Sequence, residues 1–102
     1  MKRRAAEPEW TPLADVVSKD ILRAEAHAWA KRIAVQPREI RIRPMTRKWG
    51  SCSNAGRLTL SESLLAESAQ TRREVIVHEL LHMKVPNHGK LFQASLKAHL
   101  SS

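Results

Sequence analysis

The stretch "VIVHELLHMKVPNHGKLF", from Val75 to Phe92, places three histidines and one glutamate within eleven residues. His78 and His82 are four positions apart, a spacing that puts two side chains on the same face of an α-helix. Two imidazoles placed in this way can bind one Zn²⁺ at about 2.0–2.1 Å. The stretch therefore predicts a helix that carries a metal site, and the competing interpretation is that the histidines are satisfied core residues.

Glu79 directly follows the first histidine and is rotated from it by about 100° around the helix. We expect this rotation to be too large for Glu79 to serve as a third metal ligand. It leaves the carboxylate near enough to reach a water on the metal. Two ligands and one base on a single rigid element form the HExxH arrangement of zinc hydrolases. The motif therefore predicts Glu79 as the catalytic general base.

A third histidine, His88, follows the predicted end of this helix. Pro86 disfavours helical backbone at the residue before it, and Asn87 tolerates the left-handed conformation of a turn. The chain can therefore turn back and bring His88 to the metal. We predict His78, His82 and His88 as zinc ligands, a set that leaves the fourth position to water, as in catalytic zinc sites.

The remaining elements predict an α+β domain, with helices packed on one face of a short two- to three-stranded sheet. Thr71 and Glu74 form a capping-box pattern at the start of the motif helix. In "EIRIRPM", isoleucine and arginine alternate with the period of a strand. The predicted elements are a helix from Thr11 to about Ala34 with a break near Ser18 left open, a strand in 39–45, a hairpin of strands 48–51 and 57–60 around a turn at 54–56, a helix from Thr71 to about Lys84 and a helix from about Gly89 to Leu100.

Length and composition favour one soluble globular domain over residues 1–102. The chain has 102 residues, of which 42% are hydrophobic and 27% are charged. No apolar run approaches the ~20 residues of a membrane-spanning helix, so we expect no membrane association. Cys52 is the only cysteine, which excludes an internal disulfide and favours a cytoplasmic location. We expect Cys52 to be a small buried residue rather than a ligand, and Trp49 to lie in the core.

The formal net charge of +8 is concentrated in the first half of the chain, and the densest basic run is "REIRIRPMTRK". Such a run can contact a nucleic acid, a nucleotide or an acidic partner. It can equally be a solvated strand edge that charge protects from pairing. The candidates for contacts with substrate or phosphate are Arg41, Arg43, Lys48 and Arg57. The strand "RLTL" is expected at the sheet edge beside the motif helix, where an extended peptide can add as a further strand.

Two runs together, "IRIRPMTRKWGSCSNAGRLTLSESLL" and "VIVHELLHMKVPNHGKLF", resemble the YgjP-like metallopeptidase family, close kin of SprT-like and other small gluzincin-type zinc peptidases. The matching motifs are Trp-Gly-Ser-Cys at 49–52, HExxH at 78–82 and Asn-His-x-x-x-Phe at 87–92. Lys48 stands where the family segment has arginine. The resemblance covers about Ile21 to Leu100 and implies a zincin-like fold with one Zn²⁺ per chain.

The leading hypothesis is a zinc-dependent metallopeptidase that acts on a peptide or protein substrate. Glu79 would activate a zinc-bound water, zinc would polarise the scissile carbonyl, and Glu79 would return the proton to the leaving amine. One alternative is a zinc-dependent hydrolase of nucleotide phosphoanhydrides, with the basic strand holding the phosphates. Another is a nucleic-acid-associated accessory domain with a vestigial zinc site.

Overall fold

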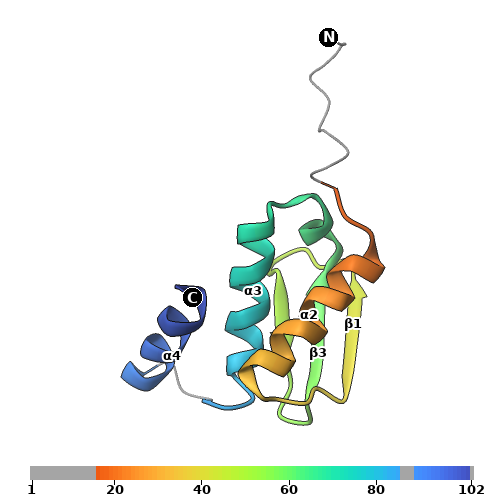
Figure 1. The fold of residues 1–102 in the computed structure, drawn as a ribbon. Helices are drawn as coiled ribbons and strands as arrows, with labels where there is room; N and C mark the ends of the chain where they lie inside the picture. The colour runs from red at the N-terminus through yellow and green to blue at the C-terminus, as the bar shows by residue number, and fades with distance from the viewer. Residues whose placement is uncertain (1–15, 86–88, 102) are drawn as a thin grey trace, which may run out of the picture.

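A computed structural model describes residues 16–85 and 89–101 of the chain, and these residues form an α+β arrangement (Figure 1). The predicted fold class is confirmed, and the short 3₁₀-helix after the last strand is an addition to it. The elements in chain order are α2 (Lys19–Ile33), β1 (Glu39–Arg43), β2 (Gly50–Cys52), β3 (Arg57–Ser61), the 3₁₀-helix η2 (Glu62–Ala66), α3 (Ala69–Leu81) and α4 (Lys90–Leu100).

The three strands form a mixed sheet with the order β1-β3-β2. β1 pairs with β3 in parallel, and β2 pairs with β3 in the antiparallel direction of the predicted hairpin. The expectation that Arg57–Leu60 lies at the sheet edge is wrong, because β1 and β2 occupy both sides of β3. β2 is instead the edge strand that contacts α3. It also begins at Gly50, two residues later than expected.

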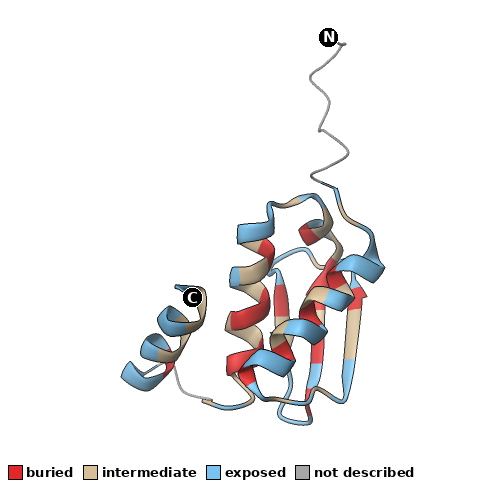
Figure 2. Cartoon of the chain, in the orientation of Figure 1, coloured by how far each residue is buried: buried red, intermediate tan, exposed pale blue. Residues whose placement is uncertain are grey.

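α2 and α3 cover one face of the sheet, and α4 lies beside α3 (Figure 1). The buried residues gather between the helices and the strands (Figure 2). β3 contributes Leu58 and Leu60 to this core, since side chains two positions apart on a strand point to the same face. The helices contribute Leu22, Ala26, Ala30 and Ile33 from α2, Ile76, Val77, Leu80 and Leu81 from α3, and Phe92 from α4.

α2 begins at Lys19, and the predicted helical start at Thr11 lies outside the described residues, so it stays a prediction. Val16 to Ser18 are not helical, and positions 11–15 lie outside the described part of the chain. Ser18 is the N-cap, and its hydroxyl accepts a hydrogen bond from the backbone N–H of Ile21 at 3.2 Å. The break near Ser18, which the sequence left open, is therefore present.

α3 begins one turn earlier than the capping-box pattern predicted. Ser68 is the N-cap, and its hydroxyl accepts a hydrogen bond from the backbone N–H of Thr71 at 3.1 Å. Thr71 is therefore inside the helix, and Glu74 accepts a hydrogen bond from the Gln70 side chain instead of closing a capping box. Serine and threonine are both common N-cap residues, and in the structure the earlier of the two, Ser68, caps the helix.

No helix among the described residues is long and apolar enough to span a membrane.

Candidate metal centre

The last turn of α3 brings His78, Glu79 and His82 together. One nitrogen of each imidazole and one carboxylate oxygen of Glu79 all lie within 4.8 Å of one another. The two imidazole rings are 5.1 Å apart, measured between centroids, and are inclined at 72°. The predicted stacking of the two histidines on one helix face is confirmed. Glu79 lies nearer to both imidazoles than the simple rotation argument suggested.

Phe92 of α4 packs against both histidines. Its ring centroid lies 5.3 Å from that of His78 and 5.0 Å from that of His82, and the residue is fully buried. An apolar wall of this kind limits the orientations of the imidazoles and keeps water from one side of the site. Phe92 belongs to the family motif, but nothing in its spacing alone pointed to a contact with the histidines.

The edge strand β2 approaches α3 closely at Gly50. A Cβ atom at this position would lie 3.2 Å from Cγ of Glu79 and 3.1 Å from the carbonyl oxygen of Thr59. The absence of a side chain at Gly50 therefore lets the backbone of β2 pass directly beside the Glu79 side chain. This close approach places an extended backbone along the side of the histidine cluster.

The environment of Glu79 shifts the pKa of its carboxyl group towards neutral pH. Burial raises the pKa of its carboxyl group to about 7, because water no longer stabilises the charged form, while the ammonium of Lys48 acts in the opposite direction. Cys52 lies in the same region. Burial, and then the charge of Glu79, raise the pKa of the Cys52 thiol, so the thiol is kept in its neutral form.

Two adjoining hollows meet at His78 and Glu79. One has a volume of about 380 Å³ and lies over both histidines. The other has a volume of about 300 Å³ and extends towards the middle of α3. The first is lined by Lys48, Gly50, Ser51, Cys52, Asn54, His78, Glu79 and His82, and the second by Lys48, Trp49, Gly50, Glu74, Val75, His78 and Glu79. Together they form a cleft along β2, called the β2 cleft below.

The remaining predicted site residues are distributed unevenly. Of the four candidate contact residues, only Lys48 lines the β2 cleft, whereas Arg41, Arg43 and Arg57 belong to β1 and β3. His88, together with Asn87, lies outside the described residues, so its role as the third ligand stays a prediction. Cys52 is half-buried and lines the cleft, but it is not part of the ligand cluster.

Trp49 is 42% exposed and lines the β2 cleft, so the expectation that it lies in the core is wrong. The residue directly precedes the edge strand, where no further strand within residues 16–85 and 89–101 covers the outer side of the chain. Together with Val75 it makes one part of the cleft apolar. In the sequence, the feature that could have indicated a place in the site was that Trp49 belongs to the Trp-Gly-Ser-Cys motif.

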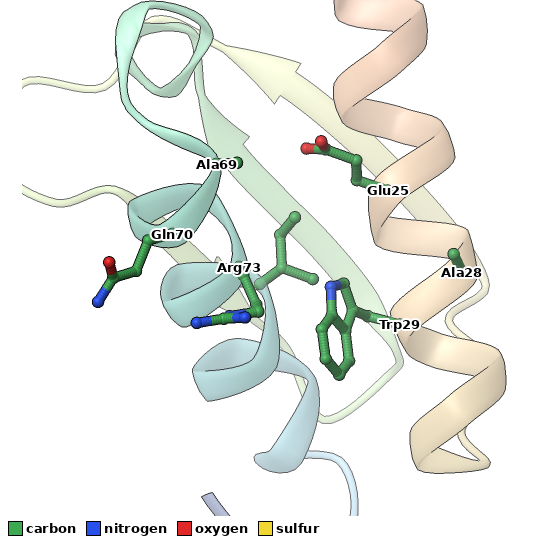
Figure 3. Close-up of a pocket in the computed structure, with 7 residues that line it drawn as sticks. Glu25, Ala28, Trp29, Ala69, Gln70 and Arg73 are labelled. Carbon is green, nitrogen blue, oxygen red and sulfur yellow. The ribbon is translucent and has the colours of Figure 1, made fainter. Parts of the chain in front are cut away.

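A separate hollow of about 510 Å³ lies between α2 and α3 (Figure 3). Its charged lining residues are Glu25 and Arg73, and none of its lining residues is a histidine or a cysteine. Glu25 accepts two hydrogen bonds from the buried Arg72 at 2.8 and 2.9 Å, which join the two helices. Nε of Arg73 is buried and has no hydrogen-bond partner among the described residues. This hollow has no residue in common with the histidine cluster.

The donor set of the cluster fits a metal ion. Two imidazole nitrogens and a carboxylate oxygen, half-buried and close together, are donors that Zn²⁺ accepts. A family model of the YgjP-like metallopeptidase domain matches residues 13–102. The chain belongs to the YgjP-like metallopeptidase family. The resemblance predicted from the motifs is thereby confirmed, and no curated protein sequence matches the chain.

Solved structures of two metallopeptidase zymogens share the fold of this YgjP-like domain. Jannalysin of Methanocaldococcus jannaschii is 24% identical, with a TM-score of 0.69 over 76% of this chain and 80% of that one. Abylysin of Pyrococcus abyssi is 21% identical, with a TM-score of 0.65 over 74% of this chain and 76% of that one. These similarities confirm the predicted zincin-like fold.

Proposed function

We propose that the chain is a zinc-dependent metallopeptidase in which Glu79 is the general base and acid. The observation that carries this proposal is the cluster of His78, Glu79 and His82 within 4.8 Å, at an edge strand, in a member of a metallopeptidase family. An edge strand, a metal-binding helix and a half-buried carboxylate are the parts that hydrolysis of an extended peptide requires.

His78 and His82 would hold the ion, with His88 as the third protein ligand. When bound, the ion would supply a Lewis acid and would lower the pKa of a water molecule in the cleft. Phe92 would keep both imidazoles in place from the side opposite to bulk water.

Glu79 would move the protons of the reaction. A general base is most effective when its pKa lies near the working pH, and burial raises the pKa of Glu79 to about 7. Glu79 can therefore take a proton from the attacking water and give it to the leaving amine. Its position on the same helical turn as His78 and His82 would keep the carboxylate close to an ion held by the two imidazoles.

The β2 cleft would bind the substrate in an extended conformation. The backbone of the peptide would add to the edge of β2 through hydrogen bonds that do not depend on sequence. Apart from the histidines, Lys48 is the only cationic residue among the described residues that line the cleft, so it is suited to stabilise negative charge that develops on the carbonyl oxygen. Trp49 and Val75 would receive an apolar side chain of the substrate.

Substitution of Glu79 tests this function. The wild-type protein, loaded with zinc, is offered unfolded protein and quenched fluorogenic peptides, and Glu79→Gln is assayed beside it. We expect the variant to keep its zinc and to lose about 10²–10⁴ in rate, the usual cost of a lost general base. Glu67→Gln, at the end of the 3₁₀-helix and outside both hollows of the cleft, is the matched control and should keep most of the activity.

Three results of this experiment would contradict the proposal or part of it. Full activity of Glu79→Gln would exclude the proposed mechanism. Loss of zinc from that variant would make Glu79 a ligand instead of a base. A wild-type protein that binds zinc and cleaves none of the peptides would exclude the proposed activity. Nucleoside triphosphates belong in the same assay, although only one of the four candidate phosphate contacts, Lys48, lines the cleft.

A further inference from the structure

The sheet has a second face that α2 and α3 do not cover, and neither does any other helix in the described part of the chain. On β1, Ile40 and Ile42 pack towards the core, so by strand alternation the residues between and beside them point to the opposite face. The same alternation holds for β3, where Leu58 and Leu60 are buried. The residues that share this opposite face, called the open sheet face below, are Glu39, Arg41, Arg43, Arg57 and Thr59.

The open sheet face is basic. It carries three arginines (Arg41, Arg43 and Arg57) and one acidic residue, Glu39, a net charge of +2. Arg38 lies directly before β1 and Arg47 before β2, and both add to the positive charge around the face. Among the described residues, Arg38, Arg43 and Arg47 take part in no ion pair.

Glu39 interacts with two arginines of the face, Arg57 and Arg41, and the net charge of the face remains positive. Its carboxylate accepts a hydrogen bond from Nε of Arg57 at 2.8 Å and lies 3.8 Å from Nε of Arg41. A guanidinium has five N–H donors, so each arginine keeps donors for a further partner. A hollow of about 230 Å³ between Arg38, Glu39, Ala55 and Arg57 gives this end of the face a concave site for an anionic group.

We infer that the open sheet face binds duplex DNA through its phosphate backbone. Arginine predominates on this face and binds phosphate in a bidentate manner. The Cα atoms of Arg41 and Arg43 are about 6.6 Å apart along the strand, so the two side chains can contact separate phosphates. None of the residues of the face is aromatic, and single-stranded nucleic acids are generally bound by stacking of bases on aromatic side chains. Contacts to the backbone alone predict binding without sequence preference.

The competing explanation is that the charges only protect the edge strand β1 from pairing with another chain. The two explanations differ in their response to charge reversal. Arg41→Glu/Arg43→Glu keeps the strand charged and therefore protected, but it repels phosphate. Arg23→Glu/Lys31→Glu makes the same change of net charge on α2, which covers the opposite face of the sheet, and is the matched control.

Binding of the full chain to a short fluorescein-labelled DNA duplex is measured by anisotropy as salt is raised from about 50 to about 200 mM. Each lost phosphate contact lowers the slope of log affinity against log salt by about 0.9, so we expect the Arg41→Glu/Arg43→Glu slope to fall by about 1.8 and its affinity by about tenfold or more. The α2 pair should change affinity less than about threefold. Arg41→Lys/Arg43→Lys, which keeps the charge, should retain most of the slope. Thermal unfolding by circular dichroism confirms that each variant is folded.

The inference is overturned if the wild type does not bind duplex DNA at the lower salt concentration, or if both reversed pairs weaken binding equally, since binding would then follow net charge alone. Tighter binding of the same sequence as a single strand would also overturn it. Displacement of DNA by polyglutamate at equal charge concentration would instead assign the face to an acidic protein. The measurement needs no bound metal and no peptidase activity, so its outcome is independent of the proposed function.

Discussion

At the scale of single residues, Glu79 combines two opposing effects on one carboxyl group. Burial raises its pKa, and the nearby positive charge of Lys48 lowers it. Because burial has the larger effect, the folded protein binds a proton more tightly at Glu79 than the unfolded chain does. The same burial that suits the residue to general-base chemistry therefore lowers stability at neutral pH.

We predict that the metal-free protein loses stability as pH rises through the window from 4.5 to about 7. In this window the folded state holds a proton at Glu79 that the unfolded state has released, so the free energy of unfolding falls with pH. We expect Glu79 to contribute about 1–2 kcal/mol to this fall, because water still reaches the group and screens it.

Urea unfolding at pH 5 and pH 8 in the presence of a chelator measures this effect. Glu79→Gln should show the smaller difference between the two pH values, and the exposed Glu74→Gln should behave as the wild type. Equal differences in wild type and Glu79→Gln would mean that burial does not perturb the Glu79 carboxyl.

Gly50 is the second residue whose identity the site requires. A Cβ atom in Gly50→Ala would meet Glu79, Thr59 and Leu60 at 3.1–3.3 Å, so β2 or the Glu79 side chain must shift. We expect a loss of about 1–3 kcal/mol in the free energy of unfolding, as for other overpacked sites. Gly89→Ala, where nothing lies within 4 Å of the new atom, is the control. A Gly50→Ala protein as stable and active as wild type would show that the close approach is not needed.

At the scale of elements, the C-terminal end of α2 contains a strained position. Ala34 adopts the left-handed conformation with φ of 67°, where the backbone N–H of Val35 donates to the carbonyl of Ala30 at 2.9 Å. Glycine is the residue that normally occupies this position, because a Cβ atom is unfavourable there. α2 therefore ends with a common left-handed helix cap, in which Ala34 occupies the position that favours glycine.

We predict that Ala34→Gly stabilises the protein by about 1 kcal/mol. For a chain of this size, the gain corresponds to a rise of about 4–8 °C in melting temperature. Ala24→Gly, at an exposed position within α2, should destabilise by about 1 kcal/mol and serves as the control. A drop in melting temperature for Ala34→Gly would contradict the assigned backbone conformation.

At the scale of the whole molecule, metal binding should join α4 to the rest of the fold. α4 contacts α3, and the ring of Phe92 packs on both histidines. The partly buried Leu96 and Leu100 of α4 pack against the hydrophobic core. His88, two positions before the start of α4 in the sequence, is the predicted third ligand. A bound ion would therefore add a link between α3 and the segment that leads into α4.

We predict that zinc raises the melting temperature and slows amide hydrogen exchange across residues 90–100. A ligand at a hundredfold excess over its dissociation constant stabilises the folded state by about 2.7 kcal/mol. His88→Ala should lose the effect on α4, whereas His99→Ala, within α4 itself, should retain it. If zinc slows exchange in α3 but leaves α4 unchanged, His88 is not a ligand.

The sequence alone predicted the features that depend on neighbours along the chain. The spacing of His78 and His82 places two imidazoles on one face of any helix, and the alternation around Ile40 and Ile42 produces a strand with two unlike faces. The α+β class and the motif helix followed from such local periodicities. The ends of the helices were less certain, because Ser68 and Thr71 are both capable of capping α3.

The tertiary structure decided which distant segments meet. β3 lies in the centre of the sheet because it pairs with both β1 and β2, and no local pattern states how many partners a strand has. The exposure of Trp49 follows from the edge position of β2, and the contact of Phe92 with the histidines follows from the packing of α4 on α3. The raised pKa of Glu79 has the same origin, since burial is produced by residues far away in the chain. Periodicity is a property of a few adjacent residues, whereas pairing, burial and pKa depend on contacts between segments that only the folded chain brings together.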